Sequence, residues 1–115
     1  MKGIRAAALA VFFFSVQSGA QTQQQDFSKI EVETTDLGHR MYMLEGGGGN
    51  ITLAASNAGV IMVDSQFAPL TAKIKAAIGK ITNQPVRYLI NTHVHPDHTG
   101  GNANFANDGV IVLAQ

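Results

Sequence analysis

The sequence predicts an α/β fold, in which β-strands alternate with a crossover helix. Short apolar runs bounded by glycine, asparagine and proline are typical of strands, and they occur on both sides of a helical pattern. In that pattern, apolar side chains recur at spacings of three and four residues after Pro69, as in an amphipathic helix. Strands separated by such a helix favour a sheet with crossover connections.

The predicted strands share a high content of Val, Ile, Leu and Met. They cover 29–34, 39–44, 51–55, 59–65, 86–90 and 110–113. The run 59–65 is almost continuously apolar until Asp64, which indicates a strand buried on both faces. Gly46–Gly49 separate two strand-like runs and predict a flexible hairpin loop that tolerates positive φ angles. A phosphate-binding loop would lead into a helix, whereas this loop leads into a strand-like run.

The predicted helix begins near Pro69, which fits the first turn of a helix, and it ends before Pro85. Its apolar stripe consists of Leu70, Ile74, Ile78 and Ile81, and the residues outside the stripe include Lys73, Lys75 and Lys80. One face of the helix is therefore expected to be apolar, with the three lysines outside that face.

The overall composition excludes several classes of protein. The chain has 115 residues, enough for one small domain, and its formal net charge is zero. No nucleic-acid partner is expected, because the charge supports no basic surface. The sequence contains no cysteine, which excludes a disulfide scaffold and a thiolate-ligated zinc site. Any metal must be bound through imidazole and carboxylate groups.

Residues 1–20 have the three-part pattern of a secretory signal peptide. Lys2 and Arg5 give a positive start, a short apolar run over 6–16 follows, and Ser18 and Ala20 place small residues before a cleavage site after Ala20. An uncleaved anchor is the weaker alternative, because the apolar run is well short of the about 20 residues that span a bilayer. We expect a periplasmic or secreted protein with no stable membrane association after cleavage.

These patterns divide the chain into three segments. Residues 1–20 are the signal peptide, 21–36 are a polar, glutamine-rich linker or mature N-terminus, and 37–115 are the folded domain. Without Lys2 and Arg5 the mature chain is slightly acidic.

The residues that carry chemistry lie in one loop after the predicted strand 86–90. Three of the four histidines of the chain fall within this loop, in the order His93, His95, Asp97 and His98. Gly100 and Gly101 supply backbone freedom where the chain turns near them. The remaining histidine, His39, stands alone and is expected on the surface or at a strand edge.

The spacing of these side chains has a geometric meaning. In extended backbone, residues i and i+2 point to the same side, so His93 and His95 can reach one ion if the strand continues through them. Pro96 favours an extended conformation at His95 and then starts a turn or short helix. That turn redirects Asp97 and His98 away from the first pair, toward a second ion nearby.

The donor types narrow the choice of metal. Imidazole and carboxylate without sulfur favour Zn²⁺, with Fe and Mn as alternatives. Catalytic zinc typically has three protein ligands and an open position for water, which then has a pKa of about 7. In sites with two metals, the ions lie about 3.5–4 Å apart and share a nucleophilic hydroxide. The loop therefore predicts a metal site suited to hydrolysis.

The order His-x-His-x-Asp-His, followed by Thr99-Gly100-Gly101-Asn102, resembles the signature of the metallo-β-lactamase superfamily. The apolar run 59–65, with its Asp near the end, is similar to an earlier motif of the same family. The resemblance covers most of residues 37–115. It implies a zinc-dependent hydrolase with an αββα sandwich and a dinuclear zinc site at one edge. It does not separate lactamases from thioesterases or lactonases.

The resemblance also implies a role for each residue of the motif. His93 and His95 belong to the first zinc, and Asp97 and His98 belong to the second. Asp97 is in addition the catalytic residue that orients or deprotonates the attacking water. Asp64 steadies the ligands, although from the sequence alone it could equally cap a helix or turn. The implied reaction is attack of metal-bound hydroxide on an ester, thioester or β-lactam carbonyl of a small-molecule substrate.

The family takes further ligands from downstream segments, whereas this sequence has no histidine after His98 and only Asp108 as a later carboxylate. We therefore expect residues 37–115 to form a partial αββα sandwich, the N-terminal half of the fold. Alone, such a chain should bind zinc weakly, hydrolyse little and aggregate through exposed strands.

Two other functions fit the same scaffold. One is a non-catalytic periplasmic metal-binding or sulfur-relay accessory protein, since relatives of this type keep the histidine loop. The other is a redox diiron protein, which is disfavoured because the flavin-dependent branch of the family typically has a glutamate at the position of His95.

Overall fold

The structure is a computed structural model that describes residues 24–114. The expected signal peptide and its cleavage site after Ala20 lie outside the described residues. None of the helices within 24–114 combines the length and the hydropathy that a membrane-spanning helix requires.

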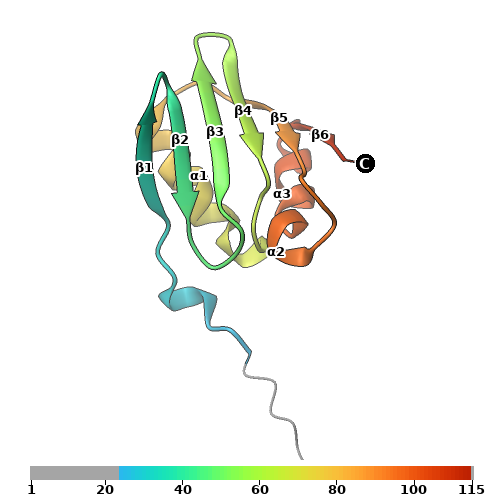
Figure 1. Cartoon of the computed structure of the whole chain (residues 1–115). Helices are drawn as coiled ribbons and strands as arrows, with labels where there is room; N and C mark the ends of the chain where they lie inside the picture. Colours follow the sequence, from blue (N-terminus) through green and yellow to red (C-terminus); the bar gives the residue numbers. More distant parts are fainter. Residues whose placement is uncertain (1–23, 115) are drawn as a thin grey trace, which may run out of the picture.

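One mixed sheet with helices on one of its faces makes up the described part of the chain (Figure 1). Its strands are β1 (Glu33–Gly38), β2 (Met41–Glu45), β3 (Ile51–Ser56), β4 (Gly59–Val63), β5 (Val86–Ile90) and β6 (Ile111–Leu113). Its α-helices are α1 (Thr71–Ile81), α2 (Pro96–Thr99) and α3 (Asn102–Asn107), and the 3-10 helices are η1 (Phe27–Lys29) and η2 (Ala68–Leu70).

The strands lie in the sheet in the order in which they occur in the sequence. β1 to β4 form an antiparallel meander, whereas β4, β5 and β6 are parallel to one another. α1 connects β4 to β5, and α2 and α3 connect β5 to β6. Because β4 and β5 are parallel, their carboxyl ends meet at one edge of the sheet, which brings Asp64 beside the histidine loop.

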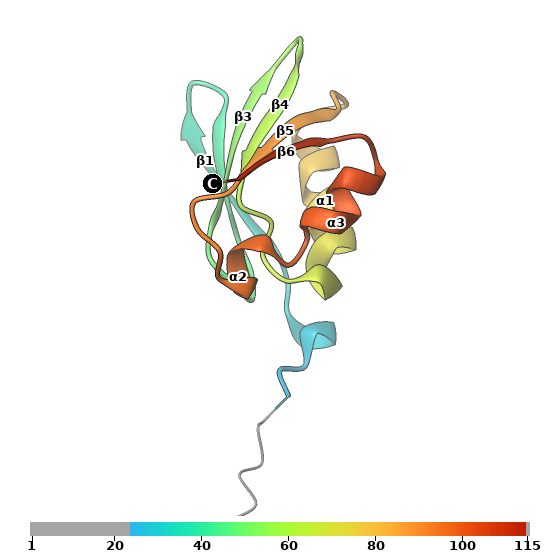
Figure 2. The ribbon, with the colours of Figure 1, turned by 90° about the vertical axis from the view of Figure 1, so that its right-hand side faces the viewer.

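Helices α1 and α3 cover the same face of the sheet (Figure 2). The buried core between these layers consists of Leu44, Ile51, Leu53, Val60, Met62, Leu70, Ile74, Ala77, Ile78, Leu89, Phe105 and Val110. The predicted apolar stripe is confirmed, because Leu70, Ile74 and Ile78 are buried and Ile81 packs against the core. Helix α3 was not predicted; its sequence, Asn-Ala-Asn-Phe-Ala-Asn, has a single large apolar residue, Phe105, and so no helical period.

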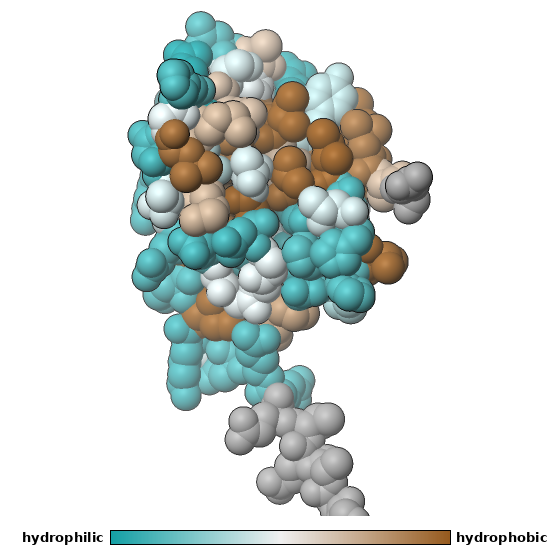
Figure 3. Space-filling model, viewed as in Figure 1, coloured by the Kyte–Doolittle hydropathy of each residue, from teal (hydrophilic) through white to brown (hydrophobic). Residues whose placement is uncertain are grey.

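The opposite face of the sheet is apolar and exposed. Its large apolar side chains are Ile61, Tyr88, Ile90, Ile111 and Leu113, which we call the open face. Ile61 pairs with Tyr88 and Tyr88 with Ile111, while Ile90 pairs with Leu113, so these side chains share one face of three strands. Apolar atoms gather on the side of the molecule without helices (Figure 3). The prediction that 59–65 is buried on both faces is therefore wrong, since Ile61 is 44% exposed.

The first strand begins at Glu33 rather than at Lys29. Asp26 caps a 3-10 turn instead, by accepting hydrogen bonds from the backbone N–H and the hydroxyl of Ser28. Lys73 on α1 holds this segment by donating to the Ser28 carbonyl oxygen at 2.9 Å. A 3-10 turn held by α1 therefore precedes β1, and β1 overlaps the predicted strand 29–34 only at its first two residues.

Candidate metal centre

The four predicted ligands lie on the loop that leaves β5 and on the short helix α2. The backbone between β5 and α2 is irregular, so the strand does not continue through His93 and His95. His95 has the extended conformation (φ −60°, ψ 141°) that its place before Pro96 predicts. Pro96 starts α2, as expected, and Asp97 and His98 follow on that helical turn.

The side chains of these four residues gather in one place. His93 Nε2 lies 3.1 Å from His95 Nδ1, and the ring centroids of His93 and His98 are 4.1 Å apart. His98 Nε2 lies 3.5 Å from Asp97 Oδ2. The three imidazoles and the carboxylate are therefore neighbours.

Asp64 lies next to this cluster, directly after β4, and is only 2% exposed. Its Oδ2 lies 2.7 Å from His98 Nδ1, and its two oxygens accept hydrogen bonds from the Thr92 backbone N–H (2.8 Å) and hydroxyl (2.7 Å). Burial raises the pKa of Asp64, but the hydrogen bonds from His98 and Thr92 outweigh burial, so the pKa lies below its ordinary value. Asp64 is therefore an ionised carboxylate that ties the histidine loop to the end of β4.

These hydrogen bonds determine which ring nitrogen carries a proton. An ionised carboxylate can only accept, so His98 Nδ1 must donate to Asp64. The Thr92 hydroxyl has a single hydrogen, which it donates to Asp64, so its oxygen accepts from His93 Nδ1 at 2.9 Å. In the neutral form of both histidines the proton is therefore on Nδ1 and the lone pair is on Nε2. At His93 this lone pair faces His95 Nδ1 at hydrogen-bond distance, 3.1 Å.

The donor set fits a divalent metal such as zinc. Two nitrogens that each lie about 2.0–2.1 Å from a tetrahedral zinc are roughly 3.3 Å apart, and His93 Nε2 and His95 Nδ1 are 3.1 Å apart. A neutral imidazole with its proton on Nδ1 is also the form in which Nε2 of His93 and His98 could bind a metal. Among residues 24–114, no group of three or more His, Asp or Glu side chains is placed to hold one ion. The described residues thus offer donor atoms that suit a metal, and a complete site would require further ligands.

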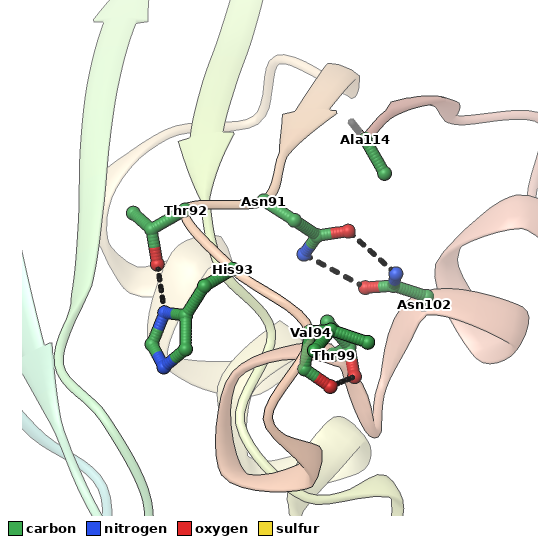
Figure 4. A pocket seen from close by; sticks show the side chains of 7 residues that line it. All are labelled: Asn91, Thr92, His93, Val94, Thr99, Asn102 and Ala114. Carbon is green, nitrogen blue, oxygen red and sulfur yellow. Dashed lines mark hydrogen bonds between the residues drawn. The ribbon is translucent and has the colours of Figure 1, made fainter.

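A network of side-chain hydrogen bonds, which no sequence pattern predicted, joins the histidine loop to the segment after β4 and to α3. The side-chain amides of Asn91 and Asn102 exchange hydrogen bonds of 3.2 and 2.6 Å (Figure 4). Ser65 donates from its hydroxyl to Asn102 Oδ1 (2.8 Å) and from its N–H to the His98 carbonyl oxygen (2.8 Å). No role was predicted for Asn91, Asn102 or Thr92. All three flank the histidine motif in the sequence, and this proximity could have indicated that they support it.

A pocket of about 490 Å³ opens beside this network (Figure 4). Its lining residues are Asn91, Thr92, His93, Val94, Thr99, Asn102 and Ala114. The volume is within the range of about 300–1,000 Å³ that is typical of small-molecule sites. The pocket reaches the predicted ligand cluster at His93.

Close packing explains why glycine, rather than a larger residue, occupies several positions near the site. Positive φ angles among the described glycines occur at Gly38, Gly59 and Gly109. The expected hairpin loop at Gly46–Gly49 joins β2 to β3, but none of these four glycines has a positive φ angle. A Cβ on Gly101 would lie 2.6 Å from the Ser65 carbonyl oxygen, so Gly101 too is needed for space rather than for backbone freedom.

The sequence model of the metallo-beta-lactamase superfamily matches residues 44–114, which is more than half of the chain. The chain belongs to the metallo-beta-lactamase superfamily. The match runs from β2 to the residue after β6, and it contains both Asp64 and the whole histidine loop. The family resemblance inferred from the histidine motif is confirmed.

Solved metallo-beta-lactamases share this fold. BJP-1, a subclass B3 metallo-beta-lactamase of Bradyrhizobium japonicum, matches with a TM-score of 0.64 and 27% identity over 71% of this chain and 32% of its own. FIM-1 from Pseudomonas aeruginosa, solved in a mono-zinc form, matches with a TM-score of 0.65 and 23% identity over 73% of this chain and 42% of its own. The predicted partial αββα sandwich is confirmed, because the described residues form one sheet with helices on one face.

A curated relative matches in sequence over a shorter stretch. The 2,4-dinitroanisole O-demethylase subunit alpha of Nocardioides sp. (strain JS1661) is 40% identical over 60 residues, which are 50% of this chain and 18% of that protein. The chain thus spans less than half the length of each of these three proteins.

Proposed function

We propose that this chain contributes His93, His95, Asp97 and His98 to the zinc site of a metallo-hydrolase, with up to two zinc ions in the complete site. The observation that carries the proposal is the 3.1 Å separation of His93 Nε2 and His95 Nδ1, with His98 and Asp97 adjacent. Fe or Mn would suit the same donors. A working site would need at least one further ligand for each ion, from residues outside 24–114 or from another chain.

The side chains of such a site would have different roles. When bound, zinc polarises the bond to be cleaved and makes a water molecule acidic enough to react near neutral pH. Asp97 has a side chain that is 41% exposed, so its carboxylate is accessible to a water molecule and can accept its proton at Oδ2. Thr92 and Asp64 keep the protons of His93 and His98 on Nδ1, which leaves both Nε2 atoms available to the metal.

The proposed substrate is a small molecule with an ester, thioester or β-lactam carbonyl. BJP-1 and FIM-1 support this class, because both are named as metallo-beta-lactamases. The relative with 40% identity is named for 2,4-dinitroanisole, which is an aryl methyl ether. The ether bond of such a compound is therefore a further candidate for cleavage. We further propose that the protein acts in the periplasm or outside the cell, on the basis of the expected signal peptide at 1–20.

Zinc titration by calorimetry tests the ligand assignment. The chain should bind zinc, and His93→Asn or His98→Asn should weaken binding at least tenfold. His39→Asn is the matched control, because His39 is exposed in a turn far from the cluster and Asn tolerates its positive φ of 51°. Equal zinc affinity in the wild type and in the variant lacking all three clustered histidines would refute the proposal. Nanomolar affinity in the wild type would contradict the incomplete ligand set.

A second assay separates the enzyme from a metal-binding accessory protein. Zinc-loaded protein, in a form that includes the further ligands, is assayed with nitrocefin, a thioester panel and 2,4-dinitroanisole. Turnover that disappears in Asp97→Asn supports the hydrolase. Full zinc loading without turnover of any of these substrates would favour the accessory role.

A further inference from the structure

The His98 imidazole lies in a narrow space with neighbours on several sides. Its side chain is 20% exposed, its Nδ1 is bound to Asp64, and the His93 ring lies 4.1 Å away between centroids. Gly49 lies against another part of the ring, where a Cβ would come within 2.7 Å of Cε1, Nε2 and Nδ1. Real Cβ atoms essentially never approach other heavy atoms closer than 3.0 Å, so alanine at position 49 would displace either the ring or the loop.

The backbone of this loop is bound to the helix that carries His98. Gly49 donates its N–H to the Asp97 carbonyl oxygen at 3.1 Å. At Gly48, a Cβ would meet the same oxygen at 2.5 Å, so the two segments are in direct backbone contact. The loop therefore cannot retreat from His98 without breaking its bond to α2.

The other end of the loop is also closely packed. A Cβ on Gly46 would lie 2.6 Å from Gln66 Oε1, and one on Gly47 would lie 2.6 Å from Ile30 Cδ1. Gln25 Nε2 donates to the Gly47 carbonyl oxygen at 3.4 Å. With α2 on one side and Gln66 and Ile30 on the other, the loop is held in place along its length.

We propose that Gly49 is a positioning residue for His98. The missing side chain leaves the space in which the imidazole keeps Nδ1 on Asp64, so that Nε2 would remain available to a metal. This inference rests on the proposed role of His98 as a ligand. It predicts that a single methyl group at position 49 changes metal binding through the orientation of the ring, although Gly49 itself contributes no donor atom.

Histidine-ring NMR on the metal-free chain tests the geometry directly. In the wild type, a nuclear Overhauser effect should join the Gly49 Hα protons to His98 Hε1, and nitrogen shifts should show the proton on His98 Nδ1. In Gly49→Ala, the protected Nδ1–H signal of His98 should be lost. The wild-type spectrum tests the contact between Gly49 and His98 even if the variant fails to fold. Absence of the Overhauser effect from the wild-type spectrum would overturn the inference.

Zinc calorimetry on the same pair gives the functional readout. Gly49→Ala should bind zinc about 10–100-fold more weakly than the wild type, with its circular dichroism unchanged. Gly79→Ala is the matched control, because Gly79 lies in α1 and a Cβ there would meet nothing within 4 Å, so zinc affinity and the His98 signals should stay unchanged. Wild-type affinity and ring signals in Gly49→Ala would overturn the inference. Failure of the wild type to bind zinc would instead refute the proposed function, while the ring signals still decide the role of Gly49.

Discussion

Asp64 Oδ2 lies 2.7 Å from His98 Nδ1, although the two residues are 34 positions apart in the sequence. The contact exists because β4 and β5 are parallel neighbours, so the residue after one strand meets the loop after the other. It fixes the orientation of the His98 ring and leaves Nε2 free. The end of β4 therefore controls a side chain that is carried by α2.

Asp64→Asn should weaken zinc binding about 10–100-fold, because the neutral amide no longer fixes the His98 proton on Nδ1. It should also lower the free energy of unfolding by about 1–3 kcal/mol, since the buried hydrogen bonds from Thr92 lose their charged acceptor. Zinc titration and urea unfolding measure the two effects. Asp36→Asn is the control, because Asp36 is exposed and its Gly38 contact survives as an amide. Unchanged zinc affinity in Asp64→Asn would contradict the role of Asp64.

The stability that Asp64 contributes should depend on pH in a defined direction. Its pKa in the folded chain is lowered, so its contribution is fully present above the unfolded value of about 3.9 and is lost as pH falls through the folded value. The difference in unfolding free energy between the wild type and Asp64→Asn should therefore be constant near neutral pH and shrink below about pH 4. Urea unfolding at several pH values checks this, and a difference that grows on acidification would show that the sign is wrong.

Asn102→Leu should destabilise the chain by about 1–3 kcal/mol, because the Asn91 amide loses both bonds of the reciprocal pair and the Ser65 hydroxyl loses one of its two acceptors. The double variant with Asn91→Leu should cost less than the sum of the two single changes, since both remove the same pair of bonds. Asn107→Leu, on the exposed side of the same helix, is the control. If the unfolding free energy lost in the double variant equals the sum of the two single losses, the reciprocal hydrogen bonds between Asn91 and Asn102 are contradicted.

Gln66→Met should stabilise the chain. Within residues 24–114, neither side-chain polar atom of the fully buried Gln66 has a hydrogen-bond partner, and such a group costs about 1–3 kcal/mol. Methionine has a similar length and removes both polar atoms. Thermal and urea unfolding should show the gain, with exposed Gln84→Met close to neutral. A clear loss of stability in Gln66→Met would indicate that a buried water satisfies the amide.

Ile61→Thr together with Ile111→Thr should reduce self-association of the chain, because both residues lie on the open face and are 44% and 53% exposed. Threonine keeps the β-branched shape that suits strands, so the fold should be preserved. Light scattering across a concentration series measures the effect. Val94→Thr is the control, since Val94 is 83% exposed but lies outside the sheet. Equal association in both variants would exclude the open face as its cause.

Local patterns in the sequence were sufficient for most elements of the fold. The strands 51–55 and 86–90 and the helix after Pro69 were predicted because their hydrophobic periods are regular. The predicted strand 29–34 reaches only the start of β1, which is exposed along its length, and α3 was not predicted because it has one large apolar residue, Phe105. These two elements owe their conformation to strand pairing and to packing on the core, which no local window contains.

The sequence by itself determined the family, the donor types and the positions of the predicted ligands, because His93, His95, Asp97 and His98 lie within one short segment whose residue types and spacing carry the information. Only the tertiary structure decided how the rings are held. The contacts of His98 with Asp64 and Gly49 join three segments far apart in the chain, through a parallel strand pair and a loop packed against α2. The lack of space for a side chain at Gly49 and the Nδ1 protons of His93 and His98 depend on that arrangement in space. No pattern along the chain could specify them.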